Sequence, residues 1–328
     1  MGVGKRNFEG DPRRCNADRP QIMLRVLGVS LAVFVASIGL CAAEKTPVRV
    51  DCSDVNSEQP SPTSSEQPSP PSNLAPGSSS GEDSAAENEL LEAANKSREL
   101  VGLPPLRLEE SLQEAARAHA RMMAASKRLE HQLPGELALL ERIARVVPED
   151  SALKIDRAGE NIANASCAPG ANDALMRSAP HRKNLLDRGF NVAGIVAIWS
   201  EGRLYVVQDF AHEVPSYSAQ QSRKLVGRAI DETRQQAGLQ QLVELAPPDL
   251  DEAACSLARE NRPDAHLLAA AYDNRKIIAY TQSRPEVLPP GALRMLGDPA
   301  VRKFAVGSCY ARNAAYPTGM YWIAILLY

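Results

Sequence analysis

Apolar residues recur at helical intervals where the chain first becomes rich in them. The recurring positions are Leu90, Leu91, Ala94 and Val101. They predict a helix that begins at the capping-box sequence of residues 84–87 and ends at Gly102. A second capping box at residues 111–114 opens an Ala- and Met-rich stretch, and it predicts another helix to about Ser126.

Further along, the pattern of apolar residues predicts more helices and then two strands. Residues 136–147 show helical periodicity, and residues 171–187 predict two short helices around Pro180. Residues 191–199 and 203–212 are apolar runs joined by a tight turn that contains Gly202, which favours an antiparallel hairpin. Helices followed by a hairpin predict an α+β domain in which helices cover an antiparallel sheet.

The second half of the chain repeats part of this pattern. One spacing of arginine, glycine and leucine occurs twice, at Arg98, Gly102 and Leu106 and at Arg234, Gly238 and Leu242. From Arg121 to Gly194 is 73 positions, whereas from Arg259 to Gly307 is 48. We therefore expect a tandem duplication whose second copy, residues 216–328, is degenerate and lacks the middle of the first.

The N-terminal residues read as a targeting segment. Residues 26–43 form an uncharged apolar run after six basic residues and end in small side chains, which is the order of a cleaved signal peptide. Because the run has 18 residues, residues 1–43 are alternatively an uncleaved membrane anchor. Cys41 also follows a faint lipoprotein-like sequence, so lipidation is a third possibility. All three place the protein outside the cytoplasm, secreted or anchored.

Residues 44–86 are rich in Ser, Pro, Glu and Gln, and they predict a disordered linker because almost nothing apolar is available to bury. Beyond residue 43 the chain has 31 basic and 37 acidic residues, so a nucleic-acid partner is not expected. We expect a monomer that meets the membrane only through its N-terminal segment. Of the exported cysteines, Cys255 and Cys309 are the favoured disulfide pair, since they lie in the same half.

No local signature of a common hydrolase, nucleotide site or zinc motif occurs in the chain. Three of the five histidines, His119, His131 and His181, lie in the middle of the first copy. His119 shares a helix face with alanines and methionines, and we expect it to be packed in the core. His212 and His266 have no polar companions in the sequence and are expected at the surface.

Two ordered motifs carry a family resemblance. Gly-Glu-Asn-Ile-Ala at residues 159–163 is followed by His-Arg-Lys-Asn-Leu-Leu at residues 181–186. With the elements before and after them, residues 87–212 resemble the CAP superfamily, the cysteine-rich secretory, antigen 5 and pathogenesis-related proteins, in its bacterial SCP-like form. The resemblance implies an α-β-α sandwich, followed here by a truncated domain of similar topology.

The resemblance also implies a surface cavity lined by two His and two Glu, which holds a divalent metal in some members. By motif position, His131, Glu160 and His181 match three of these residues. The fourth position falls near Ser178, so this chain departs from the pattern and keeps three candidate ligands. Two imidazoles and one carboxylate suit zinc or a similar cation.

Two functions follow from these residues. The first is a secreted or membrane-tethered module that binds an extracellular ligand, such as lipid, peptide or cell-wall material, with its His/Glu cavity. The second is a metal-dependent hydrolase that uses His131, Glu160 and His181 to activate water. The same residues are alternatively a structural hydrogen-bond network, and a third interpretation treats both copies as one rigid adhesive unit.

Overall fold

The computed structural model describes residues 81–247, 249–273 and 275–328. The predicted signal peptide or anchor and most of the predicted linker lie outside these residues. The folded part begins a few residues before the linker was expected to end, because β1 (Gly81–Glu82) already pairs with a strand and α1 begins at Ser84. Within the described ranges, no helix has the length and apolar content needed to cross a bilayer.

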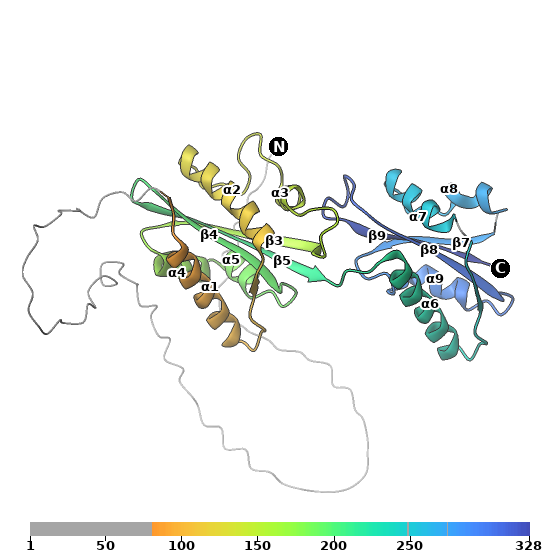
Figure 1. Ribbon diagram of the computed structural model, residues 1–328. Coiled ribbons are helices and arrows are strands. Elements are labelled where there is room, and N and C mark those ends of the chain that lie inside the picture. Colours follow the sequence, from red (N-terminus) through yellow and green to blue (C-terminus); the bar gives the residue numbers. More distant parts are fainter. Residues whose placement is uncertain (1–80, 248, 274) are drawn as a thin grey trace, which may run out of the picture. The chain divides into compact units, whose positions relative to one another are not determined.

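The described chain up to residue 214 forms one sheet with helices on both faces (Figure 1). The strands after β1 are β2 (Arg107–Leu108), β3 (Lys154–Ala165), β4 (Val192–Ser200) and β5 (Arg203–Val214). The helices are α1 (Ser84–Glu99), α2 (Glu110–Ser126), α3 (Leu139–Val146), α4 (Ala168–Arg177) and α5 (Ala179–Leu185).

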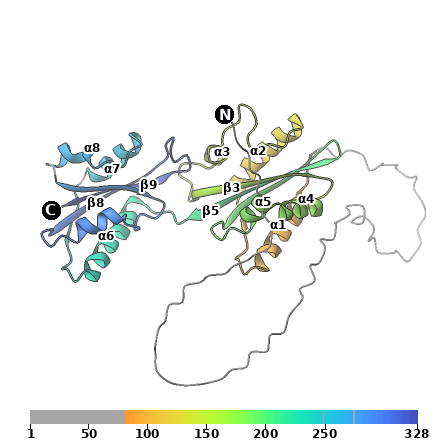
Figure 2. The ribbon, with the colours of Figure 1, turned by 180° about the vertical axis from the view of Figure 1, so that it is seen from behind.

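The central strands are β4 and β5, and β3 lies at the edge beside β5. These neighbours are antiparallel, while the short β2 runs parallel to β4. Helices α1, α4 and α5 bury their apolar side chains against one face, and α2 and α3 cover the other, as the view from behind also shows (Figure 2). The predicted α+β fold, an α-β-α sandwich with an antiparallel sheet, is confirmed.

Local signals were less reliable than the pattern of elements. Asp83, not Ser84, caps α1 by accepting a hydrogen bond from the Ala86 amide, and α2 has no side-chain cap at Glu109. The predicted hairpin turn is present, with positive φ at both Glu201 and Gly202, the geometry that matches the twist of paired strands. Sequence reasoning treated the Gly-Glu-Asn segment only as a motif and missed that it lies in β3.

A single buried arginine connects several segments of the first domain, which is the described chain up to residue 214. The Arg98 side chain, at the end of α1, is 1% exposed and donates hydrogen bonds of 2.9 Å to four carbonyl groups. The acceptors belong to Pro104, Leu185, Asp187 and Phe190. Because buried carbonyls need partners, this one side chain fixes both the turn after α1 and the loop after α5.

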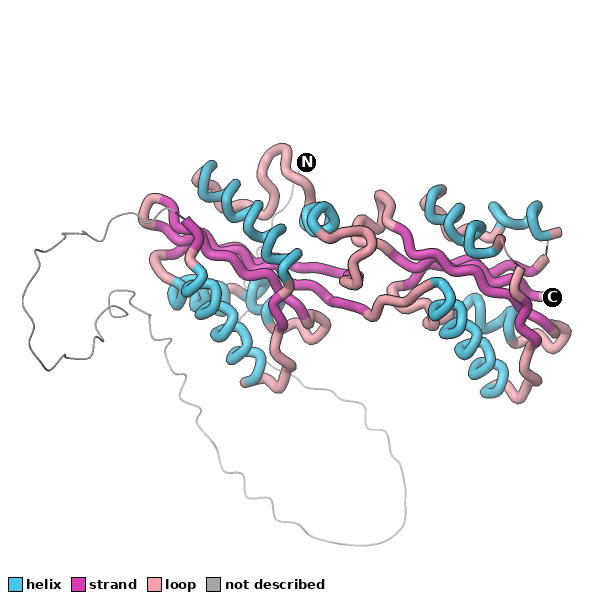
Figure 3. Tube along the Cα trace, in the orientation of Figure 1, coloured by secondary structure: helices cyan, strands magenta, loops and turns pink. Residues whose placement is uncertain are grey.

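The described chain after residue 214 forms a second sheet, and Figure 3 shows helices on both of its faces. Its strands are β6 (Val243–Leu245), β7 (Lys276–Gln282), β8 (Lys303–Ala311) and β9 (Met320–Leu327). Its helices are α6 (Ala219–Gln236), α7 (Leu250–Arg259), α8 (His266–Ala269), the 3-10 turn η2 (Ala270–Tyr272) and α9 (Pro290–Leu296).

Both sheets share an order and direction of strands. In the second, β8 and β9 are the central antiparallel pair, β7 is the edge strand beside β9, and β6 runs parallel to β8. Arg234 repeats the contacts of Arg98, because its buried guanidinium donates to the carbonyls of Gln240, Leu296 and Asp298. The repeated sequence signal therefore marks a repeated structural role.

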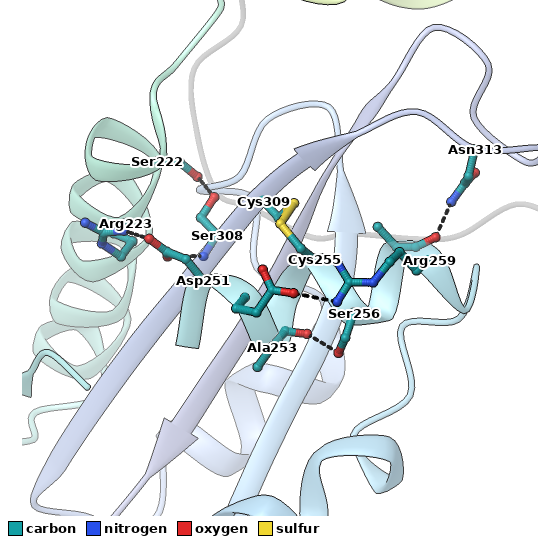
Figure 4. Close-up of a disulfide and its surroundings, with 12 residues drawn as sticks. Ser222, Arg223, Asp251, Ala253, Cys255, Ser256, Arg259, Ser308, Cys309 and Asn313 are labelled. Atoms are coloured by element: carbon teal, nitrogen blue, oxygen red, sulfur yellow. Dashed lines mark hydrogen bonds and ion pairs between the residues drawn. A yellow bond between two sulfur atoms is a disulfide. The ribbon is translucent and has the colours of Figure 1, made fainter. Parts of the chain in front are cut away.

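A disulfide joins α7 to β8 through Cys255 and Cys309, as the sequence favoured (Figure 4). Near it, the Asp251 carboxylate accepts a hydrogen bond from the Ser308 amide and pairs with Arg223 on α6. The Ser308 hydroxyl donates to that of Ser222, 2.6 Å away and also on α6. The covalent bond and these polar contacts connect helices on both faces to one central strand.

Each arginine is expected to stabilise its own domain, and the two tryptophans of the chain report on the domains separately. Trp199 lies in β4 and Trp322 in β9. Replacing Arg98 by Met leaves buried carbonyls without donors and should cost about 3 kcal/mol or more. In a Trp322→Phe background, where Trp199 is the remaining tryptophan, Arg98→Met should lower the urea concentration at the midpoint of unfolding measured by fluorescence. Arg188→Met replaces an exposed arginine and should leave that midpoint unchanged. An unshifted midpoint with Arg98→Met would contradict the role assigned to this side chain.

The disulfide closes a loop of 54 residues in sequence separation. A loop of that length predicts about 4 kcal/mol of stabilisation from the restricted unfolded chain. The Cys255→Ser/Cys309→Ser variant should therefore lower the urea midpoint seen by Trp322 in a Trp199→Phe background. Equal destabilisation seen by Trp199 in the opposite background would show instead that the disulfide acts on both domains.

Candidate functional site

The site is built on the edge strand β3, beneath helix α2. Gly194, Asp209 and Glu160 lie side by side in one row across β4, β5 and β3. A Cβ on Gly194 would stand 2.2 Å from the backbone carbon of Leu112 in α2, so only glycine allows the helix this close to the sheet. The close approach brings His119, two turns further along α2, to within 3.7 Å of Glu160.

Glu160 is the centre of the cluster. Its side chain is 4% exposed and its Oε1 lies 2.8 Å from Nδ1 of His131. Oε2 pairs with the guanidinium of Arg142 and lies 3.7 Å from Nε2 of His119. A buried carboxylate is costly unless it is paired and hydrogen-bonded, and here both oxygens are engaged.

A second buried carboxylate, Glu136, enters from the segment before α3. Its Oε1 lies 2.7 Å from Nδ1 of His119 and 3.6 Å from Nη1 of Arg142, and its Oε2 accepts from the Leu133 amide. His119 is fully buried, as expected of a histidine packed in the core. Its Nδ1 contacts Glu136, whereas its Nε2 has no hydrogen-bond partner among the described residues. The predicted cavity residues included one carboxylate, Glu160. The structure adds a second, Glu136, which lies far in sequence from Ser178, where the family pattern places its second glutamate.

Asp209 is the third acidic group of the cluster. It lies next to Glu160 in the strand register and is completely buried. Burial first, and then the negative charge of Glu160, raises the pKa of the Asp209 carboxyl well above its ordinary value. Its environment therefore favours the neutral acid, which adds no negative charge beside Glu160.

His181 reaches the same edge from α5, on the other face of the sheet. Its ring centroid lies 6.2 Å from that of His131, and the two rings are tilted by 47°. Burial, followed by the charge of His131, lowers the pKa of His181. The structure thus brings His131 and Glu160 into direct contact and places His181 beside His131.

The two sequence motifs are joined by their asparagines. Asn161 Nδ2 donates to the His181 carbonyl at 3.0 Å, and Asn184 Nδ2 donates to the Glu160 carbonyl at 3.1 Å. These bonds fasten α5 to β3, so the motif pair has a structural role in addition to supplying His181 and Glu160. Gln208 is paired with Asn161 at 3.2 Å and therefore faces away from Glu160.

Sequence reasoning missed Arg142, Glu136 and Asp209. Arg142 and Glu136 lay within the predicted helix at residues 136–147, where an arginine among apolar residues was the available signal. Asp209 in an otherwise apolar strand was another. The interpretation of His212 as lacking polar companions was wrong, since its Nδ1 lies 2.8 Å from a carboxylate oxygen of Asp156.

The arrangement does not fit the divalent metal that the resemblance implies. His131 and Arg142 occupy the two oxygens of Glu160, and a guanidinium is a fixed positive charge. In the described part of the chain, no group of three or more His, Cys, Asp and Glu is placed to hold a metal ion. The ligand set His131, Glu160 and His181 stays a prediction, and no hydrolytic step is derived from it.

An apolar cavity of about 260 Å³ lies between α2 and the α3 segment. Its lining is mostly aliphatic and includes Ala115, Ala118, Met122, Leu137 and Val146. Glu136 and Arg142 of the polar cluster also line it. The cavity and the cluster therefore share two side chains.

The His131–Glu160 contact should make stability depend on pH. The hydrogen bond to Glu160 raises the pKa of His131 above its ordinary value of 6.5. The stabilisation is then complete below about pH 6.5 and is lost as pH rises through the higher folded-state pKa. Since 56% of the His131 side chain is exposed, we expect less than about 1 kcal/mol.

His131→Gln should therefore lose stability against the parent at pH 6 and little at pH 9, measured by urea unfolding of the Trp322→Phe background. Exposed His266→Gln is the control and should show no such trend. A difference between His131→Gln and parent that grows with pH would refute the assigned contact.

Comparisons with known proteins agree with this fold. The model of the cysteine-rich secretory protein family, CAP, matches residues 91–210. The uncharacterized protein YkwD of Bacillus subtilis (strain 168) is 32% identical over 113 residues, which are 34% of this chain and 42% of that relative. The chain thus spans less than half the length of the relative it matches.

Two solved structures are also similar. An extracellular protein containing an SCP domain from Bacillus anthracis is 25% identical, with a TM-score of 0.35 over 40% of this chain and 41% of that one. An outer surface protein of Borrelia burgdorferi is 16% identical, with a TM-score of 0.37 over 41% of this chain and 98% of that one. The family match and the relative support the CAP superfamily for residues 91–210.

Proposed function

We propose that this protein is an extracytoplasmic CAP module that binds a small, largely apolar group in the cavity between α2 and the α3 segment. The observation that carries the proposal is the pairing of an open apolar cavity with a polar cluster whose charges already compensate one another. A cluster in which Glu136 and Glu160 are already paired supports binding and positioning better than metal-assisted hydrolysis.

The lining indicates the chemistry of the ligand. An apolar cavity of about 150 Å³ is large enough to bind benzene, so about 260 Å³ accommodates an aromatic ring or a short alkyl chain. Arg142 Nε is buried and has no hydrogen-bond partner among the described residues. A ligand group that carries one hydrogen-bond acceptor beside its apolar part would complement this lining. Acyl or aromatic portions of lipid, peptide or cell-wall material have that character.

The location outside the cytoplasm rests on two independent features. The Cys255–Cys309 disulfide is of the kind that persists in oxidising compartments. Residues 26–43 have the composition of an export or anchoring segment. We therefore propose a secreted or membrane-tethered protein whose folded part is carried beyond a linker.

We also propose that residues 216–328 are a degenerate second copy. The shared strand order, the equivalent hydrogen bonds of Arg98 and Arg234, and Gly307 packed under Leu250 as Gly194 is under Leu112 all support this origin. The second copy would then contribute scaffold rather than a polar site.

Filling the cavity tests the ligand proposal. Ala118 is an exposed helix residue that lines it, so Ala118→Phe should fold normally and occupy the space. The probes are 4-ethylbenzoate and 4-ethylbenzamide, detected by saturation-transfer NMR with the full chain. We expect at least one probe to bind and the Phe variant to weaken it by tenfold or more.

The matched control is Ala125→Phe, because Ala125 is exposed on the same helix and does not line the cavity. It should bind the probe as the parent does. Equal weakening by both variants would place binding elsewhere on α2. Absence of binding by the parent would remove the support for this ligand class.

A further inference from the structure

Arg142 occupies the centre of a buried, acidic group of side chains. Only 6% of its side chain is exposed, and it contacts Glu160 and lies 3.6 Å from Glu136. Its Nη1 also donates to the backbone carbonyl of His131, the predicted cavity histidine, at 3.1 Å. The guanidinium is therefore anchored by backbone as well as by charge.

The surrounding side chains are those that would otherwise suit a metal. His131 and His119 lie 2.8 and 3.7 Å from the two oxygens of Glu160, and His181 lies next to His131. Imidazole and carboxylate are common ligands of zinc. What separates this cluster from a cation site is the guanidinium that bridges its carboxylates.

A divalent ion and Arg142 cannot share Glu160 at low cost. At a few ångströms in a buried setting, a dication and a guanidinium repel strongly. The guanidinium cannot escape by losing its proton, because arginine stays charged in proteins. The ion would have to displace the side chain from Glu160, Glu136 and the His131 carbonyl together.

We propose that Arg142 is the resident cation of this site and that it excludes zinc and similar ions from the cluster of His119, His131, Glu160 and His181. Helix α3 delivers a charge of fixed position where a bound metal would otherwise compensate Glu160. The proposal concerns the polar cluster alone, so it can fail while ligand binding in the apolar cavity holds, and the reverse is equally possible.

The test is zinc binding by the full chain purified without a His tag. Binding is measured by competition with a chromogenic zinc chelator and by the shift of the thermal midpoint with zinc. The parent should compete weakly and show no zinc-dependent shift. Arg142→Ala and Arg142→Gln remove the charge, and we expect at least one of them to bind zinc tenfold or more tighter than the parent.

Arg142→Lys is the control, because it keeps a positive charge and should remain like the parent. Adding Glu160→Gln to the binding variant should abolish the gain. If a variant fails to fold alone, recovery of its folded fluorescence on adding zinc supports the proposal equally. Stoichiometric zinc in the parent that is lost with Glu160→Gln, or no gain in either uncharged variant, overturns it.

Discussion

The ion pair between Arg142 and Glu160 is the interaction on which the architecture of this site depends. Glu160 is buried on an edge strand beneath a helix that approaches the sheet over a glycine. A carboxylate in that position requires compensation from a side chain that can reach across the edge. Helix α3 supplies it, and the segment that delivers the helix also supplies Glu136. Helix α3 and the residues before it thus supply both a cation that pairs with Glu160 and a second buried carboxylate.

The same compensation divides the cluster into inner and outer parts. The side chains of His119, Glu136 and Arg142 are buried, and Glu136 contacts both of the others, while His131 remains more than half exposed. The neutral form favoured at Asp209 keeps a third negative charge from opposing Glu160. The guanidinium of Arg142 therefore faces the carboxylates of Glu160 and Glu136 inside the cluster, and an apolar cavity adjoins it.

Elements with strong periodicity could be predicted from the sequence, and contacts across elements could not. The apolar runs at residues 191–199 and 203–212 gave the central hairpin because alternation and turn chemistry are local properties. Glu160 and His131 came together only through the family resemblance, since 29 residues separate them. Arg142 escaped notice because an arginine in an amphipathic helix normally faces water. Its inward position depends on a carboxylate from another element, which no local pattern reveals.

The second sheet shows what happens when the charge is absent. In the first sheet the row beneath the helix is Gly194, Asp209 and Glu160; in the second the corresponding register is Gly307, Ala324 and Ala279. Both acidic positions are alanine there, so nothing beneath α7 needs a buried cation. The interval from α7 to β8 is also shorter than that from α2 to β4 by about the length of the segment that carries Glu136 and α3. The described part of the first sheet thus has the carboxylate, its arginine and the helix that positions it, and the second sheet lacks both acidic residues at the corresponding register, as expected if these parts form one electrostatic unit.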